Sequence, residues 1–204
     1  MSTSTTAKKF PSFTEYTTFR TFTLDEYHKM IGSGVLTDGE PYELLEGYLV
    51  KKMSRGELHD AAIQALIKRF FRLLPPGWDI RAQCAVTLTD GSEPEPDFAF
   101  VRGDETKYRK HHPGPSEIGL VVEVSNTSLD VDRIDKKRIY ARAGIPVYWV
   151  VNLVDRMIEI YTQPSGQCEL PTYANQTNYS VTASAPVVLD GATVGMIGVV
   201  EVMG

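Results

Sequence analysis

The sequence is short of cysteine and of long apolar runs. Its 204 residues include two cysteines, Cys84 and Cys168, which stand far apart and outside any CxxC or Cys/His spacing. A disulfide framework and a structural zinc site are therefore excluded. The longest apolar stretch, residues 145–154, is far shorter than the roughly 20 residues of a membrane-spanning helix. Because residues 1–22 also lack the apolar core of a secretory signal, we expect a cytoplasmic protein without membrane partners.

Positive charge is also scarce, and it is unevenly placed. The chain has 21 Lys and Arg against 26 Asp and Glu, a net charge of −5, and neither Lys nor Arg follows Arg156. This balance excludes a generally basic nucleic-acid coat and restricts phosphate binding to the part of the chain before that residue. Basic residues suited to contact a phosphate backbone there are Lys51, Lys107, Arg109 and Lys110. Ordinary solvated surface charge is the alternative interpretation for each of them.

With 42% hydrophobic residues the composition is that of a globular protein, and local patterns predict a mixture of helices and strands. Thr23 and Glu26 have the spacing of a capping box, and Glu46-Gly47 marks a hairpin turn. Helices are expected at residues 24–31, 57–74 and 129–143. Strands are expected at residues 80–88, 96–101, 118–124, 147–154 and 157–161, with a final hairpin around residues 190–191. Since a helix separates strands 118–124 and 147–154, we expect them to be parallel neighbours.

Two carboxylates stand in or beside apolar strands. Glu123 interrupts the run Gly-Leu-Val-Val-Glu-Val, where an ionised carboxylate is costly unless a cation or a hydrogen-bond donor partners it. Asp97 precedes Phe-Ala-Phe-Val, so we expect the two acids to converge from neighbouring strands. Two hard oxygen ligands on rigid strands suit Mg²⁺, with water and substrate phosphate completing the coordination. For each acid alone, a solvated strand end or a pairing with arginine is the competing interpretation.

The helix expected at residues 129–143 has a polar face. Asp132, Lys136 and Tyr140 follow one another at intervals of four and therefore share a face. Apolar neighbours on the same helix would pack on the sheet and direct Lys136 toward the strand ends. The alternative is a solvated ladder of Asp132 with Lys136, which contributes only a few tenths of a kcal/mol.

Three ordered segments carry a resemblance to a known family. They are Glu-Pro-Asp-Phe-Ala-Phe-Val at residues 95–101, Gly-Leu-Val-Val-Glu-Val-Ser at residues 119–125, and the block from Asp132 to Asn152. Together they resemble the Uma-two-type family of restriction endonucleases, within the PD-(D/E)XK nuclease superfamily. The similarity extends upstream through residues 42–47 and His59, and it covers about residues 23–161.

The resemblance implies a fold and an organisation of the chain. The fold is α/β: a restriction-endonuclease-like core with a central mixed β-sheet flanked by helices, plus a β-rich C-terminal extension. Residues 1–22 would form a flexible N-terminal arm, and residues 23–162 the nuclease domain. Residues 163–204 would form the extension, packed on the same domain.

The resemblance also implies a metal-dependent phosphodiesterase. Asp97 and Glu123 would be metal ligands, with the backbone carbonyl of Val124 as a third. The cofactor would be Mg²⁺, with Mn²⁺ as a substitute. Glu43 would be an outer ligand to metal or water, and His59 would hydrogen-bond the carboxylates or a phosphate. For each of these last two residues a structural role is the alternative.

The position of the lysine departs from the superfamily pattern. That pattern places a lysine two residues after the second carboxylate, and here the position is Ser125. In the Uma-two-type branch the lysine comes from the following helix, and Lys136, four residues before Tyr140, matches it. Lys137 is the less suitable neighbour because the helical period turns it about 100° away.

The expected activity is cleavage of DNA by a homo-oligomer, with a dimer as the first expectation. One alternative is a DNA-binding module that keeps the fold without turnover, which Ser125 in place of lysine favours. Another is an oligomeric accessory protein whose acidic C-terminal segment contacts a partner. Retention of Asp97, Glu123 and Lys136 favours the nuclease.

Overall fold

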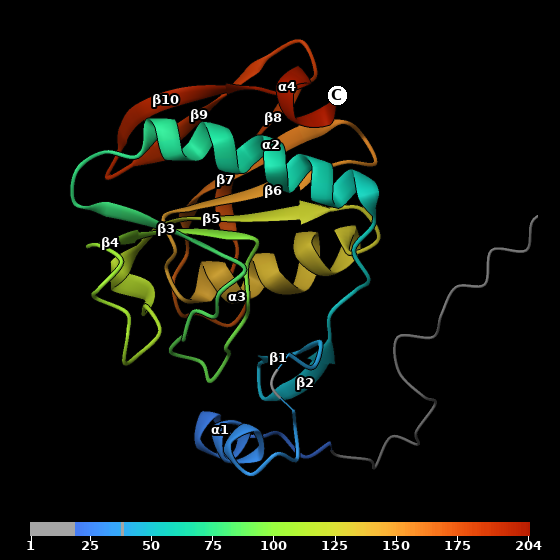
Figure 1. The fold of residues 1–204 in the computed structure, drawn as a ribbon, viewed down its shortest axis with the longest axis vertical. Helices are drawn as coiled ribbons and strands as arrows, with labels where there is room; N and C mark the ends of the chain where they lie inside the picture. The colour runs from blue at the N-terminus through green and yellow to red at the C-terminus, as the bar shows by residue number, and fades with distance from the viewer. Residues whose placement is uncertain (1–18, 38) are drawn as a thin grey trace, which may run out of the picture.

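The computed structural model describes residues 19–37 and 39–204, so almost all of the N-terminal arm expected at residues 1–22 lies outside the described residues. A six-stranded central sheet has the order β3-β4-β5-β6-β7-β8 (Figure 1). Its strands are β3 (Trp78–Ala82), β4 (Phe98–Arg102), β5 (Ile118–Ser125), β6 (Val147–Asn152), β7 (Met157–Pro164) and β8 (Tyr173–Ser180). Strands β5 and β6 are parallel, as predicted, and every other neighbouring pair is antiparallel.

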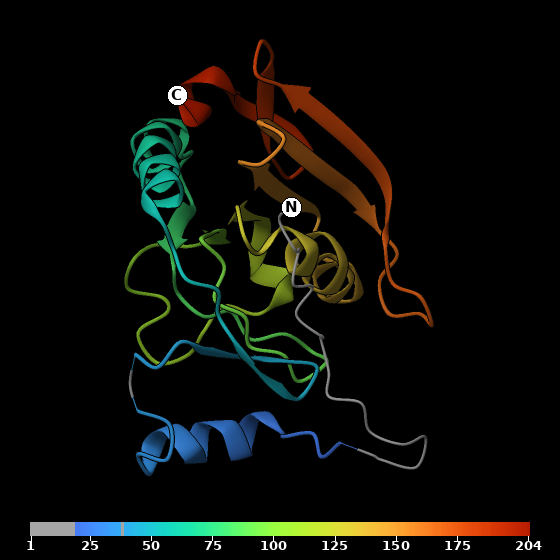
Figure 2. The ribbon, with the colours of Figure 1, turned by 90° about the vertical axis from the view of Figure 1, so that its right-hand side faces the viewer.

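Helices cover both faces of this sheet. The helical elements are α1 (Leu24–Gly32), α2 (Glu57–Leu73), η1 (Pro115–Glu117), η2 (Val131–Lys136), α3 (Lys137–Arg142) and α4 (Val200–Met203). In Figure 1 α2 runs above the sheet and α3 below it, and Figure 2 shows the C-terminal hairpin of β9 (Ser184–Leu189) and β10 (Ala192–Gly198) on the side of α2. The expected mixed sheet with flanking helices and additional C-terminal strands is therefore confirmed.

Two apolar cores result from the alternation of side chains along the strands. Val122 and Trp149 belong to the core beneath α2, α4 and the β9–β10 hairpin. Val121 and Tyr148, one residue earlier in each strand, belong to the core beneath α3. Because β5 and β6 are buried on both faces, a charged residue in either strand lies inside the protein.

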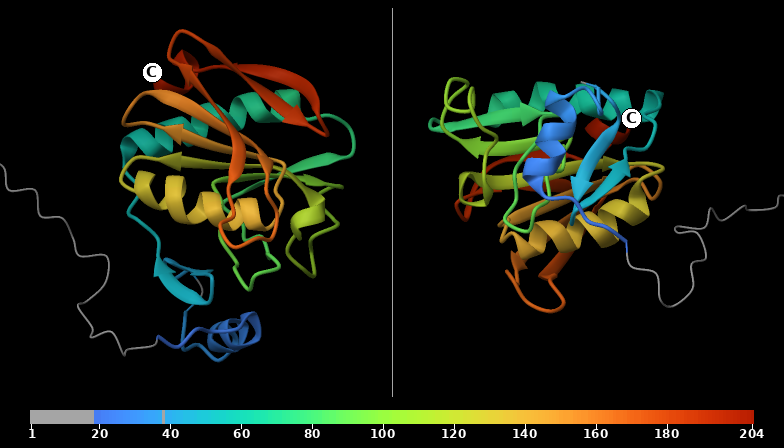
Figure 3. Two further views of the ribbon diagram at one scale, coloured as in Figure 1. Left: turned by 180° about the vertical axis from the view of Figure 1, so that it is seen from behind. Right: turned by 90° about the horizontal axis from the view of Figure 1, so that it is seen from below.

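A separate hairpin and α1 lie at the lower end of the molecule (Figure 3). Strands β1 (Tyr42–Leu45) and β2 (Tyr48–Lys51) are joined by Glu46 and Gly47, whose φ angles are 50° and 82°. Two successive positive φ values form the turn that suits the twist of a tight hairpin, as predicted. The capping box of Thr23 and Glu26 is present at the start of α1, and the amide of Phe22 donates to the carbonyl of Gly47 (2.8 Å).

The strand expected at residues 80–88 is too long, and one strand of the expected β-rich C-terminal extension was not located individually. Residues 83–88 were expected to extend β3, but Gln83 has a φ of 54° and the chain leaves the sheet after Ala82. Strand β8 was not predicted: its sequence is mostly polar and its side chains are mostly exposed. It is the last strand of the sheet, where one side of the pleat faces water and polar residues are tolerated.

The helix expected at residues 129–143 contains a π-helical segment. Residues Val131–Lys136 (η2) precede the α-helical turns of α3, and the amide of Lys137 donates to the carbonyl of Asp132, five residues earlier. The π form is rare and occurs most often as a single turn inside an α-helix, frequently at a functional site. Among the described residues no helix has the length and apolar character needed to cross a membrane.

A buried ion pair attaches this π-helical segment to the sheet. The Glu159 carboxylate on β7 is fully buried and accepts hydrogen bonds from Arg133 Nε (3.0 and 3.1 Å), Asn152 Nδ2 (2.8 Å) and Tyr161 Oη (2.6 Å). Burial opposes ionisation of Glu159, but these hydrogen bonds, Arg133 first, hold its pKa below the usual range. The carboxylate therefore stays charged in the folded protein.

We expect Glu159→Ala to lower the free energy of unfolding by about 2–3 kcal/mol, because the buried donors of Asn152 and Tyr161 lose their acceptor. Asp155→Ala removes the exposed partner of Arg133 (3.1 Å) and should cost about 1 kcal/mol or less. Urea unfolding measures both. Since the folded pKa lies below the unfolded one, this stabilisation is complete above the unfolded pKa and is lost as the pH falls through the folded pKa. Equal losses for the two variants would contradict the assignment.

Candidate active site

The register of β4 against β5 brings Asp97 beside Glu123. Phe98 pairs with Val122, so continuing the antiparallel pairing by one residue sets Asp97 opposite Glu123. The backbone amide of Val124 donates to Asp97 Oδ2 (2.9 Å) and fixes that side chain on β5. Both acids are buried: Asp97 is 7% exposed and Glu123 is 4% exposed. The structure therefore brings the two acids together from neighbouring strands.

Lys136 points from η2 into the same cluster. Its Nζ lies 3.0 Å from Glu123 Oε1 and 3.1 Å from Glu43 Oε1, and the residue is 7% exposed. Tyr140, one turn later on α3, donates its hydroxyl to the same Glu123 oxygen (2.8 Å). Asp132 instead accepts a hydrogen bond from Ser125 Oγ (2.7 Å). The alternative of a solvated ladder between Asp132 and Lys136 is therefore wrong, because both side chains are buried in a network with the strands.

Glu43 and His59 come to the cluster from different elements. Glu43 lies on β1, and its Oε2 accepts a hydrogen bond from the amide of Glu95 (3.1 Å), which ties the β1–β2 hairpin to the segment before β4. His59 is in the first turn of α2, with Nε2 3.2 Å from Asp97 Oδ2. Its Nδ1 is buried without a hydrogen-bond partner in the described part of the chain, although Asp60 Oδ1 lies 3.5 Å away.

His59 and Asp97 act on each other electrostatically. The hydrogen bond to Asp97 raises the pKa of His59, against the effect of burial. Burial alone would raise the pKa of Asp97, but the hydrogen bond and charge of His59 and the amide of Val124 outweigh it and lower that pKa. Asp97 is therefore ionised, and His59 is the group that holds it so.

Acidic side chains outnumber basic ones around Glu123. Burial raises the pKa of Glu123 well above its usual range, against the effect of Lys136, and three neighbouring carboxylates raise it further. These are Asp132, Asp97 and Glu43. Burial lowers the pKa of Lys136, but the same acidic neighbourhood, Glu123 first, raises it well above its usual value. The cluster holds a charged lysine among several acids, and an additional cation bound here would favour the ionised form of Glu123.

The donor set fits a hard divalent cation. Within residues 19–37 and 39–204, no three His, Cys, Asp or Glu side chains are grouped as a ready-made metal site. Mg²⁺, however, commonly binds through one or two protein carboxylates, with water and substrate phosphate supplying the other oxygens. Asp97 and Glu123 are two such acidic side chains on rigid strands, and they lie in a region where acidic groups outnumber basic ones.

Some contacts of the site were not predicted. The sequence pattern places Tyr140 on the polar helix face but does not predict its hydrogen bond to Glu123. Its spacing of four residues from Lys136 is the pattern that could have indicated this contact. The amide Nε2 of Gln83 lies 3.4 Å from Asp97 Oδ1, and no pattern in the sequence indicates this contact. Ser125, which occupies the usual lysine position, is fully buried against Asp132.

The predicted basic contacts do not join the carboxylate cluster. Lys107 pairs with Glu117 (2.8 Å), while Arg109 and Lys110 are exposed in the loop that leaves the C-terminal end of β4. Asp97 precedes the opposite end of that strand. Lys51 is exposed at the end of β2. These four residues are surface charges that the structure places outside the site.

Residues 24–193 match a protein family described as "Uma2: Putative restriction endonuclease". The chain belongs to the Uma2 family. The resemblance seen in the sequence is thus confirmed, and it places the chain in a nuclease family. A crystal structure described as a putative nuclease belonging to DUF820, from Anabaena variabilis ATCC 29413, is similar with a TM-score of 0.64 and 16% sequence identity, covering 89% of this chain and 97% of that chain. At that identity the likeness shows a shared fold. No curated protein sequence matches the chain.

Proposed function

We propose that this Uma2 protein is a magnesium-dependent endonuclease that hydrolyses DNA phosphodiester bonds, with Mn²⁺ as a substitute metal. The observation that carries the proposal is the position of Lys136. Its ammonium group reaches Glu123 (3.0 Å) from the helix, beside the carboxylate of Asp97, although Ser125 occupies the superfamily's lysine position. The chain therefore presents two acids and a lysine together, which is the set that phosphodiester hydrolysis needs.

Asp97 and Glu123 would hold the cation, with the backbone carbonyl of Val124 as a third oxygen. When bound, the cation supplies Lewis-acid stabilisation of negative charge on the phosphate. His59 keeps Asp97 ionised and oriented through the 3.2 Å contact. Glu43 is the second carboxylate that contacts Lys136 (3.1 Å).

Lys136 would act on the phosphate or on the attacking water. Its high pKa keeps it an ammonium at neutral pH, so it orients a water through hydrogen bonds and offsets the negative charge that grows in the transition state. Because the group is buried, this charge acts through a lower effective dielectric than it would at the surface.

The direct experiment is cleavage of supercoiled plasmid by the purified full chain, with Mg²⁺, with Mn²⁺ and with EDTA. We expect nicked and linear DNA with either metal and intact plasmid with EDTA. A matching RNA substrate tests whether cleavage is confined to DNA. Metal-independent cleavage, or cleavage of RNA alone, would contradict the proposal.

Ser125 favours one alternative, a nuclease fold that binds DNA without turnover, alone or as an oligomeric accessory protein. Plasmid that is shifted in a gel but never cut, under conditions where the protein is folded, would support it. We also propose that the protein acts as a dimer in the cytoplasm, since a dimer would bring two sites to the two strands of a duplex at once. Light scattering after size-exclusion chromatography measures the oligomeric state.

Tyr140→Phe should lower kcat/KM about ten-fold, because it removes a hydrogen bond to a charged or partly charged group, which is worth about 1.5–3 kcal/mol. The ring itself, which packs 5.0 Å from that of Tyr148, remains. Tyr173→Phe is the matched control: its buried hydroxyl donates to the carbonyl of Ile145 (2.9 Å) and not to a carboxylate. Equal kcat/KM values for the two variants would remove Tyr140 from the site.

A further inference from the structure

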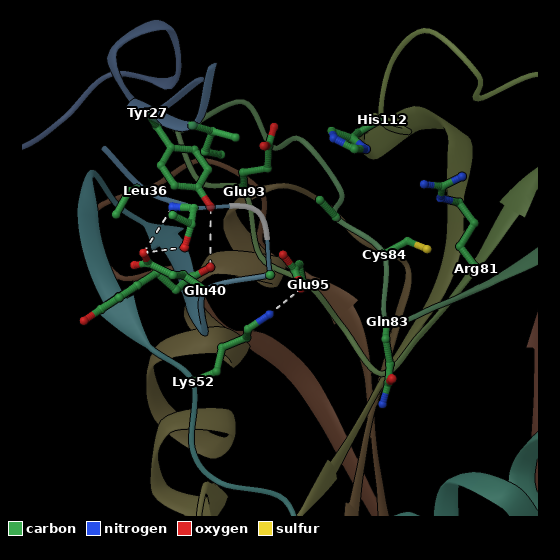
Figure 4. Close-up of a pocket in the computed structure, with 15 residues that line it drawn as sticks. Tyr27, Leu36, Glu40, Lys52, Arg81, Gln83, Cys84, Glu93, Glu95 and His112 are labelled. Carbon is green, nitrogen blue, oxygen red and sulfur yellow. Dashed lines mark hydrogen bonds and ion pairs between the residues drawn. The ribbon is translucent and has the colours of Figure 1, made fainter. Parts of the chain in front are cut away.

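A cavity of about 480 Å³ opens beside the carboxylate cluster (Figure 4). It lies between α1, with the residues that follow it, and the segments at residues 81–85 and 93–95. Two of its lining residues contact the cluster directly. Gln83 lies 3.4 Å from Asp97, and the amide of Glu95 donates to Glu43 (3.1 Å). A ligand in this cavity would therefore lie next to a phosphate bound at the two acids.

The two sides of the cavity differ in character. Tyr27 and Leu36 provide apolar surface on one side, where Glu40 also lies, and Arg81 and His112 stand on the opposite side (Figure 4). Ile31 is a further apolar lining residue. We call this cavity the Arg81 pocket. An amphipathic ligand with one apolar and one anionic part matches this division.

The carboxylates that line the pocket are already engaged. Glu95 pairs with Lys52, and Glu93 accepts hydrogen bonds from Thr87 Oγ1 (2.7 Å) and pairs with His28 (2.8 Å). Glu40 accepts a hydrogen bond from the hydroxyl of Thr37 (2.7 Å). Two of the three acids thus have a basic neighbour, and the side of the pocket with Arg81 and His112 is the one that offers cationic groups to a ligand.

Arg81 is in the opposite situation. Its Nε is buried without a hydrogen-bond partner among the described residues, and its guanidinium lies over the ring of Tyr108, 5.6 Å from the centroid. An arginine that lines a cavity and has an unpartnered donor suits a phosphate or carboxylate, which its planar fork matches. Arg81 pairs with Ala99 across β3 and β4, two residues along from Asp97. An anion bound by Arg81 would thus lie close to a phosphate bound at Asp97 and Glu123.

The backbone at the junction is unusual. Gln83, between Arg81 and Asp97, has a positive φ of 54°, which a non-glycine residue adopts at some cost. This conformation turns the chain out of β3 and places its side chain against Asp97.

We propose that the Arg81 pocket binds one unpaired nucleotide of the nucleic-acid substrate, next to the phosphate that is cleaved. Arg81, with His112 at the rim, takes the flanking phosphate, and the base lies against the apolar surface. The volume exceeds what a phosphate ion needs and suits a nucleotide, and an apolar surface accepts any base through its face. The inference rests on the proposed function, because it assigns a subsite of the same active site.

The test is the affinity for a short fluorescein-labelled single-stranded DNA, measured by anisotropy in EDTA so that no cleavage occurs. Arg81→Ala should weaken binding about ten-fold and reduce the slope of log affinity against log salt by about one. The matched control, Arg72→Ala, removes an exposed arginine of α2 that does not line the pocket, and should change affinity less than about two-fold. His112→Ala, in an exposed loop, should weaken binding about three-fold. Equal affinities for the Arg81 and Arg72 variants would overturn the proposal.

Further arms of the experiment separate other causes. If Arg81→Ala does not fold, Arg81→Gln together with His112→Ala makes the same test, with melting curves as the measure of folding. A free 5′-mononucleotide that displaces the oligonucleotide at equal concentration would show a free-nucleotide site and overturn the assignment to the substrate strand.

In cleavage assays with metal, Arg81→Ala should raise KM about ten-fold with kcat changed less than three-fold. A wild-type protein that binds DNA through Arg81 without cutting it would contradict the proposed function alone, whereas cleavage with an unchanged KM in Arg81→Ala would contradict the pocket alone.

Discussion

Asp97→Asn and Glu123→Gln are each expected to lower metal-dependent cleavage on the order of a thousand-fold or more, the size of effect seen when a main electrostatic element of a site is removed. The amide substitutions keep the shape of the side chains and one acceptor oxygen each, and they replace the other oxygen by an NH2 donor. In Asp97→Asn the new amide oxygen can still accept from the amide of Val124, so the fold should be retained. The loss therefore reports the missing negative charge.

Calorimetric titration with Mg²⁺ and Mn²⁺ is the measurement that locates the loss. Both variants should lose most of the binding heat. Melting curves measured beside the titrations show how much stability Glu123→Gln loses with the charge that faces Lys136 (3.0 Å). Asp190→Asn removes an exposed carboxylate that pairs with Arg102 and should leave metal binding and cleavage unchanged. If Asp97→Asn and Glu123→Gln bind Mg²⁺ as the parent does, the two acids are not the metal ligands.

Lys136→Ala should lower cleavage by about a hundred- to a thousand-fold with metal affinity nearly unchanged. Its ammonium is the buried cation between Glu123 and Glu43. Lys137→Ala is the natural control because the two residues are adjacent. Lys137 is partly exposed, with Nζ 5.4 Å from the centroid of the Tyr161 ring, and its loss should change cleavage less than about three-fold.

Removing Lys136 also leaves buried carboxylates without their counter-charge, so stability must be measured beside activity. Lys136→Met keeps the volume of the side-chain stem and separates packing from charge. It should be as inactive as Lys136→Ala. Small and equal losses for the Lys136 and Lys137 variants in folded preparations would move the balance to the DNA-binding protein without turnover.

Local sequence determined much of the fold. The turn at Glu46-Gly47 requires two residues that tolerate positive φ, and the observed angles of 50° and 82° satisfy the hairpin that the pattern predicted. The parallel pairing of β5 and β6 follows from the length of the connection between two apolar strands. These features depend on neighbours in the chain, which is why they could be predicted without the structure.

The predictions that failed concern segments whose structure depends on contacts with distant parts of the chain. Residues 83–88 have a strand-like composition, yet the positive φ of Gln83 directs them away from the sheet. Strand β8 carries few apolar residues and is a strand because β7 offers it an unpaired edge. Neither result follows from local propensity, since the energy comes from pairing and packing with segments far along the chain.

The candidate site shows the same division. The types of residue at Asp97, Glu123 and Lys136, and their order, came from the sequence and from family resemblance, because a carboxylate in an apolar strand needs a partner wherever it lies. Only the tertiary structure decided that Lys136 contacts both Glu123 and Glu43, that Tyr140 donates to the same oxygen, and that Gln83 touches Asp97. These distances depend on strand register and on the π-helical turn. A sequence specifies which charges must be buried, but the packing of separate elements sets which of them meet.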